Sequence, residues 1–112
     1  MTDTPDIPNV PLLIGGKLVQ SRSEQWRDIV NPATQKVLAR VPMATAEEVN
    51  AAVASAQQAF ATWRKTAIGA RARVFLKYQQ LIRENMKELA AILTAEQGKT
   101  LADAEGDVFR GL

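Results

Sequence analysis

The stretch Val41-Pro-Met-Ala-Thr-Ala-Glu-Glu-Val49 marks the point at which this sequence changes from strand patterns to helix patterns. Thr45 and Glu48 have the spacing of a capping box, in which the hydroxyl accepts from the third helical amide and the carboxylate accepts from the amide of the cap residue. Apolar residues then recur at helical spacing as far as Trp63. The pattern predicts a helix over residues 46–63.

The residues before this point have the pattern of short strands separated by turns. Leu12–Val19 contains the doublet Gly15-Gly16, which is typical of a hairpin turn, so we predict two short strands around it. Trp26–Val30 and Val37–Val41 are further candidate strands. The segment between them, Asn31-Pro-Ala-Thr34, predicts a turn because a residue before proline avoids the helical region.

The residues after Trp63 predict more helix. An apolar stripe starts near Ala70 and continues to Leu93, longer than the usual helix of roughly 8–20 residues, so a break near Asn85 is expected. Gly98 suits a left-handed C-terminal cap. The segment therefore predicts one long, broken helix that ends close to Gly98.

A third helix is predicted at the end of the chain. Thr100 and Asp103 have capping spacing, and the helix they open runs toward Arg110. The expected order is strands first and then about three helices. Because a parallel sheet needs strands that alternate with helices, this segment supplies antiparallel strands and a helical layer to a larger α/β structure.

Composition excludes several classes of function. The 112 residues contain no cysteine and no histidine, which removes the thiolate nucleophile and the commonest zinc ligand, so we expect no metal site. The net charge of +2 comes from scattered residues, which argues against a nucleic-acid partner. No apolar run approaches the roughly 20 residues of a membrane span.

The first residues predict an extended arm and a cytoplasmic location. Residues 1–11 contain three prolines, which favour extended backbone. Asp3 and Asp6 stand where a secretory signal would carry basic residues, and the same acids are unlike a mitochondrial transit peptide. We therefore expect a cytoplasmic protein.

Charged residues cluster on the last predicted helix. Asp103, Asp107 and Arg110 are four and three residues apart, so they can share one helical face. Spacing alone favours a surface ion-pair ladder, which contributes little to stability. The doublet Gly15-Gly16 lacks the third glycine and the following helix of a dinucleotide-binding fingerprint, so a turn is favoured over a phosphate site.

The run Glu96–Leu112 resembles a signature of the aldehyde dehydrogenase superfamily, and most closely its CoA-acylating methylmalonate-semialdehyde branch. Leu13–Val19 resembles the opening hairpin of the superfamily, and Val30-Asn-Pro-Ala-Thr34 resembles its Asn-Pro-Ala-Thr turn. These two elements are shared by aldehyde dehydrogenases generally, whereas Glu96–Leu112 is specific to the branch. The resemblance covers residues from about 12 to 112.

This resemblance implies an α/β enzyme with a Rossmann-like coenzyme domain, of which residues 12–112 would be a truncated N-terminal part. Members of the branch use NAD and coenzyme A to convert methylmalonate or malonate semialdehyde into propionyl-CoA or acetyl-CoA, with release of carbon dioxide. The reaction runs through a cysteine thiolate and a thioester. The implied parent is a homo-tetramer, and the first partner of this segment is the remainder of its own chain.

No catalytic, cofactor-binding or metal-binding residue can be carried over to this segment, because it contains neither a cysteine nor a glycine-rich nucleotide turn. The segment alone is therefore expected to be inactive. Arg110 is the single candidate site residue: the resemblance places it where the branch presents a guanidinium to the substrate carboxylate. The neighbouring Phe109 suits either the aliphatic part of that pocket or an ordinary core position.

Two alternatives stay open at this point. The segment could be a non-catalytic helical interaction fragment, because an alanine-rich helix and a hairpin can also serve assembly. It could also come from a non-acylating aldehyde dehydrogenase, although the run Gly106–Gly111 disfavours that origin.

Overall fold

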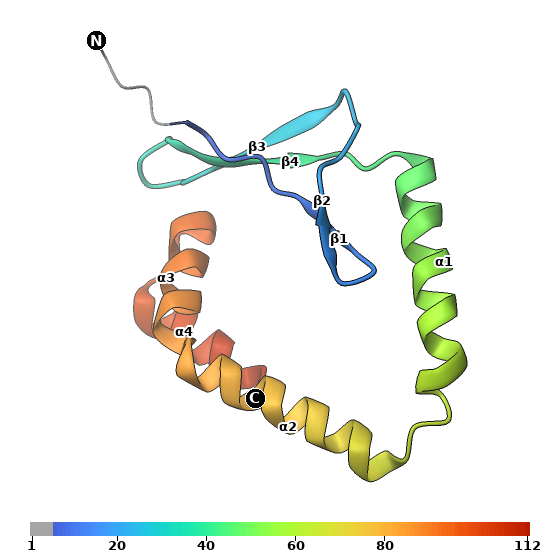
Figure 1. The fold of residues 1–112 in the computed structure, drawn as a ribbon. Helices are drawn as coiled ribbons and strands as arrows, with labels where there is room; N and C mark the ends of the chain where they lie inside the picture. The colour runs from blue at the N-terminus through green and yellow to red at the C-terminus, as the bar shows by residue number, and fades with distance from the viewer. Residues whose placement is uncertain (1–5) are drawn as a thin grey trace. The chain divides into compact units, whose positions relative to one another are not determined.

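The computed structural model describes residues 6–112, which form two compact units. The first unit contains the residues up to Val30 together with Lys36–Arg64, and the second contains Asn31–Gln35 together with Lys65–Leu112. Figure 1 shows the strands in the first unit and the last three helices in the second. The two units are described separately below.

The first strands of unit one form the predicted hairpin. Strand β1 (Leu12–Ile14) pairs antiparallel with β2 (Lys17–Val19). Gly15 and Gly16 both have positive φ, +60° and +75°, the conformation of a two-residue hairpin turn that glycine adopts without strain. The prediction of two short strands around a glycine turn is confirmed.

The second strand pair has the predicted positions with one difference. Strand β3 (Trp26–Val30) pairs antiparallel with β4 (Val37–Pro42), and the register shifts between Ile29 and Val30. Strand β4 includes Pro42, which was expected to lie just beyond its end. Pro42 stands opposite Trp26 at the last pair of the ladder, where the missing N–H of proline is tolerated.

The end of the predicted arm, residues 1–11, is joined to β4. Residues 1–5 lie outside the described part of the chain. Beyond them, Asn9 forms a parallel bridge with Arg40: the Val10 N–H donates to the Arg40 carbonyl at 2.8 Å, and the Arg40 N–H donates to the Pro8 carbonyl at 2.9 Å. The last residues of the arm therefore cover part of the free edge of β4.

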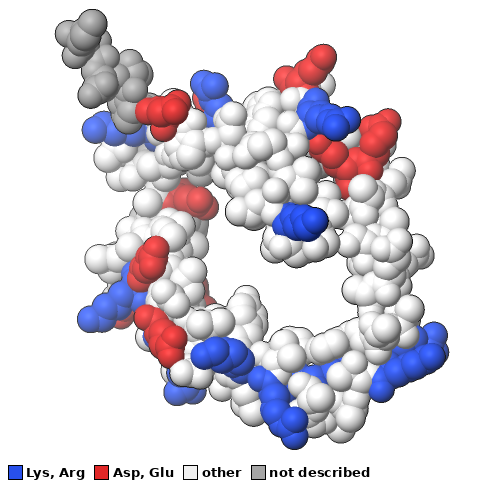
Figure 2. Space-filling model, in the orientation of Figure 1, with Lys and Arg blue, Asp and Glu red and all other residues white. Residues whose placement is uncertain are grey.

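Helix α1 (Ala46–Trp63) has the predicted bounds and the predicted capping box. The Glu48 N–H donates to Thr45 Oγ1 at 3.2 Å, and the Thr45 N–H donates to Glu48 Oε2 at 2.9 Å. Beyond its first turn α1 has no charged side chain, and Figure 2 shows this length of the helix as uncharged surface. Phe60 is 57% exposed, so the apolar face of α1 is only partly covered in this segment.

Unit two contains three helices. Together with α1 they make four helices in residues 6–112, whereas about three were expected from the sequence. The long stripe forms α2 (Ile68–Glu84) and α3 (Met86–Gln97), and it breaks at Asn85, as the pattern predicted. The cause is local, because the Asn85 side-chain amide donates to the Leu81 carbonyl at 2.8 Å and satisfies the end of α2. Helix α4 (Leu101–Arg110) follows.

Helices α3 and α4 pack against each other and contain the buried core of unit two. Ala90 on α3 and Ala104 on α4 have no exposed surface, and they are the two apolar residues classed as buried within residues 6–112. Small side chains allow two helix backbones to approach closely. This packing holds the junction between α3 and α4, where the charged residues of the candidate site lie.

Candidate functional site

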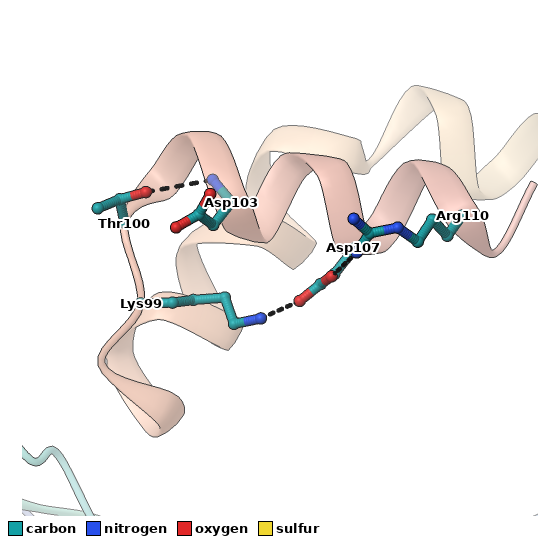
Figure 3. A network of polar contacts seen from close by, with 5 residues as sticks. All are labelled: Lys99, Thr100, Asp103, Asp107 and Arg110. Carbon is teal, nitrogen blue, oxygen red and sulfur yellow. Dashed lines mark hydrogen bonds and ion pairs between the residues drawn. The ribbon is translucent and has the colours of Figure 1, made fainter.

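The α3–α4 junction is shaped by a glycine cap followed by a threonine cap. Gly98 ends α3 in the predicted left-handed conformation, with φ +85°. Thr100 is the N-cap of α4, and its Oγ1 accepts from the Asp103 N–H at 3.2 Å (Figure 3). Lys99 lies between the two caps, so its backbone is held on both sides.

Asp107 lies at the centre of an ion-pair network at this junction. Lys99 Nζ donates to Asp107 Oδ2, and Arg110 Nη1 donates to Asp107 Oδ1, as Figure 3 shows. Asp107 and Arg110 are one turn apart on α4. The Lys99 and Asp107 side chains are 25% and 30% exposed, whereas Arg110 is 76% exposed. The network therefore has a partly covered pair and one exposed guanidinium.

The two cations lower the pKa of the Asp107 carboxyl below its ordinary value of 3.8. The hydrogen bond from Lys99 is the largest cause, and the charges of Lys99 and Arg110 add to it, against a smaller effect of burial. Asp107 is therefore ionised at neutral pH. The three residues together carry one net positive charge, because two cations share one carboxylate.

An open, mostly polar pocket of about 360 Å³ lies beside this network. It is lined by Gln97, Lys99, Ala102, Asp103, Gly106, Asp107 and Arg110. Gly106 lies one turn from Ala102 and from Arg110, and apart from the backbone of its own helix and its chain neighbours, a Cβ at Gly106 would meet nothing within 4 Å. The small residues leave this face of α4 hollow, with the guanidinium at its end. Such a surface can accept a small anion.

The structure brings together part of the residue set that spacing predicted. Asp107 and Arg110 pair on one face of α4, while the Asp103 side chain joins neither ion pair and lines the pocket instead. Lys99, which follows the glycine cap of α3, pairs with Asp107. Phe109 is 63% exposed and does not line the pocket.

A second polar cluster joins the loop after β2 to α1. The Arg22 N–H donates to Glu48 Oε1 at 2.6 Å, and Ser21 Oγ donates to Glu48 Oε2 at 2.9 Å. The Arg22 and Thr45 backbone hydrogen bonds are the main causes that lower the pKa of Glu48 below 4.5. The Thr45 contact belongs to the capping box of α1, and the Ser21 and Arg22 contacts hold the loop after β2 against this cap, so we assign the cluster to the fold and not to a binding site.

Within residues 6–112, no helix combines the length and the apolar character needed to cross a membrane.

Comparison with known proteins connects this geometry to a family. Residues 18–112 match the aldehyde dehydrogenase family. The chain is 59% identical over 106 residues to the mitochondrial acylating methylmalonate-semialdehyde/malonate-semialdehyde dehydrogenase of Homo sapiens. It is 57% identical over 105 residues to the mitochondrial acylating methylmalonate-semialdehyde dehydrogenase of Arabidopsis thaliana. These matches cover 95% and 94% of this chain but only 20% and 17% of the two relatives.

Solved structures agree with the sequence matches. A Sinorhizobium meliloti protein assigned as a methylmalonate-semialdehyde dehydrogenase, in complex with NAD, superimposes with a TM-score of 0.92 at 42% identity. That match covers 96% of this chain and 22% of the other. Lactaldehyde dehydrogenase from Escherichia coli gives a TM-score of 0.88 at 34% identity, over 93% of this chain and 22% of its own. The chain belongs to the aldehyde dehydrogenase family.

Proposed function

We propose that this chain is the N-terminal part of an NAD-dependent, CoA-acylating oxidoreductase. The enzyme would convert methylmalonate semialdehyde, or malonate semialdehyde, into propionyl-CoA or acetyl-CoA with release of carbon dioxide. One observation carries the proposal: 59% identity along 95% of this chain to a relative named for that acylating reaction. The chain spans about a fifth of the length of that relative, so the activity is proposed for the longer protein.

The cofactors belong to the same proposal. NAD would accept the hydride of the aldehyde, and coenzyme A would accept the acyl group. A related structure contains NAD, which supports the first of these. We assign no residue of this chain to either molecule. We place residues 12–112 in the coenzyme-binding domain of the parent enzyme, after the arm of residues 1–11, and we expect the parent to be a homo-tetramer.

The contribution of this segment to the reaction would be substrate recognition by Arg110. The proposed substrates carry a carboxylate at the end away from the aldehyde, and a guanidinium can bind a carboxylate through two parallel hydrogen bonds. Arg110 ends the polar pocket on α4, and its side chain is 76% exposed, so its remaining N–H groups are accessible. The net positive charge of the Lys99–Asp107–Arg110 network favours an anionic partner.

The activity is tested on the full-length protein encoded by the gene. Purified protein should form NADH from methylmalonate semialdehyde and release propionyl-CoA only when coenzyme A is present. Formation of the free acid in place of the thioester would contradict the acylating assignment and would favour a non-acylating aldehyde dehydrogenase. Absence of NADH formation with any aldehyde would favour a non-catalytic role.

The role of Arg110 is tested by comparing two substrates. Arg110→Ala should lower kcat/KM for methylmalonate semialdehyde about ten- to hundredfold, because a charge-assisted bidentate contact contributes roughly 1.5–3 kcal/mol. The kcat/KM for propanal, which has no carboxylate, should be almost unchanged. Arg110→Lys should recover only part of the loss. Arg83→Ala, which removes an exposed arginine from α2, is the matched control. An equal loss for both substrates would remove Arg110 from the site.

Cellular location is a separate part of the proposal. The relatives at 59% and 57% identity are named as mitochondrial proteins. The cytoplasmic location expected from the sequence remains our proposal for this protein, and fractionation of the source cells tests it.

A further inference from the structure

The ion-pair network at the α3–α4 junction points to a second residue that acts in substrate recognition. We propose that Asp107, itself held by Lys99, is a positioning residue that orients the Arg110 guanidinium toward the carboxylate of the substrate. The inference rests on the proposed function, because it assumes that Arg110 contacts that carboxylate. It adds two residues, Asp107 and Lys99, to a site for which the sequence indicated only Arg110.

Arg110 needs such a partner because it is a long, exposed side chain. Its side chain is 76% exposed, so packing restrains it little, and an unrestrained arginine samples many rotamers. A bidentate contact requires the plane of the guanidinium to face the carboxylate. Nη1 is bound to Asp107 Oδ1, which fixes one edge of that plane and leaves the other edge for the substrate.

Asp107 can act as an anchor because it is itself held. Its Oδ2 accepts from Lys99 Nζ, and both side chains are mostly covered, at 30% and 25% exposure. The backbone of Lys99 lies between the left-handed Gly98 and the N-cap Thr100, so the anchor is tied to the junction of two packed helices. The order of restraint therefore runs from the junction to Lys99, then to Asp107, and last to Arg110.

Lys99 has a second effect, which concerns charge. Alone, Asp107 would neutralise Arg110 and would compete with the substrate carboxylate for the guanidinium. With Lys99 bound to the other carboxylate oxygen, the network keeps one net positive charge. The arrangement thus combines orientation by Asp107 with an attractive potential for an anion.

Positioning and simple electrostatics predict opposite signs for the loss of Asp107. If charge alone mattered, removal of this carboxylate would leave two cations and would lower KM for an anionic substrate. If Asp107 positions Arg110, its removal raises that KM although the site becomes more positive. The sign of the change therefore separates the two explanations.

The experiment uses the full-length protein and two aldehydes, methylmalonate semialdehyde and propanal. Asp107→Ala should raise KM for methylmalonate semialdehyde about two- to fivefold, the effect expected from loss of an exposed ion pair. The kcat for methylmalonate semialdehyde should be unchanged, and so should kcat and KM for propanal. Asp107→Glu should restore part of the affinity, and Asp107→Asn replaces Asp107→Ala if the latter does not fold. Glu105→Ala removes an exposed acid from the same helix and is the matched control.

Double variants test whether the three residues act as one unit. Arg110→Ala combined with Asp107→Ala should be no worse than Arg110→Ala alone, since Asp107 acts only through Arg110. Lys99→Met should raise KM for methylmalonate semialdehyde, and adding Asp107→Ala should not raise it further. Additive losses in either pair would contradict the proposed order of restraint.

The outcomes also separate this inference from the proposed function. One outcome would overturn the positioning role and leave the substrate assignment intact. In it, Arg110→Ala loses activity selectively toward methylmalonate semialdehyde, whereas Asp107→Ala has a lowered or unchanged KM for that substrate. Equal losses for both aldehydes in Asp107→Ala, with a lower melting temperature, would identify a purely structural ion pair and overturn it as well. If Arg110→Ala itself shows no selectivity, both proposals are wrong.

Discussion

Replacement of Gly98 by alanine should destabilise the α3–α4 junction more than Gly16→Ala destabilises its own hairpin turn. Gly98 has φ +85°, a region that is unfavourable for a residue with a Cβ. A Cβ built on Gly98 would also lie 2.8 Å from Pro32 Cγ. The proline ring is stiff and cannot rotate away as a long side chain would, so Gly98→Ala combines backbone strain with a steric clash.

The two effects have separate magnitudes. Left-handed backbone costs about 1–2 kcal/mol for alanine relative to glycine. The clash with Pro32 adds an overpacking cost of about 1–3 kcal/mol, because the ring or the junction must move. The sum, about 2–5 kcal/mol, corresponds to at least a thirtyfold increase in the opening equilibrium of this region, at about 1.4 kcal/mol per factor of ten.

Hydrogen exchange of the full-length protein measures this change locally. Amides of α3 and α4 should exchange about thirtyfold faster or more in Gly98→Ala, with α1 unchanged. The matched control is Gly16→Ala: Gly16 also has positive φ, +75°, but a Cβ there meets nothing within 4 Å, so only strain applies. If the two variants open their own regions to the same extent, the clash with Pro32 contributes nothing and the reasoning is wrong.

Two further predictions concern the start of α1. Thr45→Ala removes the hydroxyl that accepts from the Glu48 N–H, so it should destabilise α1 by about 1 kcal/mol. Hydrogen exchange should show this as faster exchange of the amides in the first turn of α1. The control Thr62→Ala, at the other end of α1, should leave the exchange of those amides unchanged. The pKa of Glu48 is lowered from 4.5, so its stabilisation is present above that pH and is lost as the pH falls through the lower folded-state value. The difference in melting temperature between the wild type and Glu48→Gln should therefore be largest near neutral pH and should shrink in acid; a difference that grows in acid would refute this assignment.

Local signals explain why much of the fold could be predicted from the sequence. The doublet Gly15-Gly16, the capping pair Thr45 and Glu48, and the glycine at position 98 each determine the backbone within a few residues. Such signals depend on hydrogen bonds and φ preferences that operate without tertiary structure. The beginning of α2 was placed near Ala70 and lies at Ile68, because its N-cap, Ala67, makes no side-chain cap hydrogen bond that a pattern could reveal.

The candidate site was less predictable, because its central contact is not at helical spacing. Asp107 and Arg110 are three residues apart, and the pairing rule for helices predicted them. Lys99 is eight residues from Asp107 and lies outside α4, so no periodicity connects the two. Their contact depends on the direction in which the chain leaves Gly98. A lysine directly after a glycine cap, followed by an acid on the next helix, is the signal that could have indicated it.

The position of Gly98 also connects two motifs that are far apart in the sequence. The Asn31–Thr34 turn resembles an element of aldehyde dehydrogenases generally, and the run Glu96–Leu112 resembles a signature of one branch. In unit two, Pro32 of the turn lies so close to Gly98 that a side chain there would collide with it. The glycine is thus required twice, by its positive φ and by the proline beside it. Because Lys99 follows Gly98 directly, the shared turn helps to fix the residue that holds Asp107, and through Asp107 the guanidinium of Arg110. The Asn31–Thr34 turn and the proposed recognition residues of α4 are therefore connected through Gly98 within one unit of the fold.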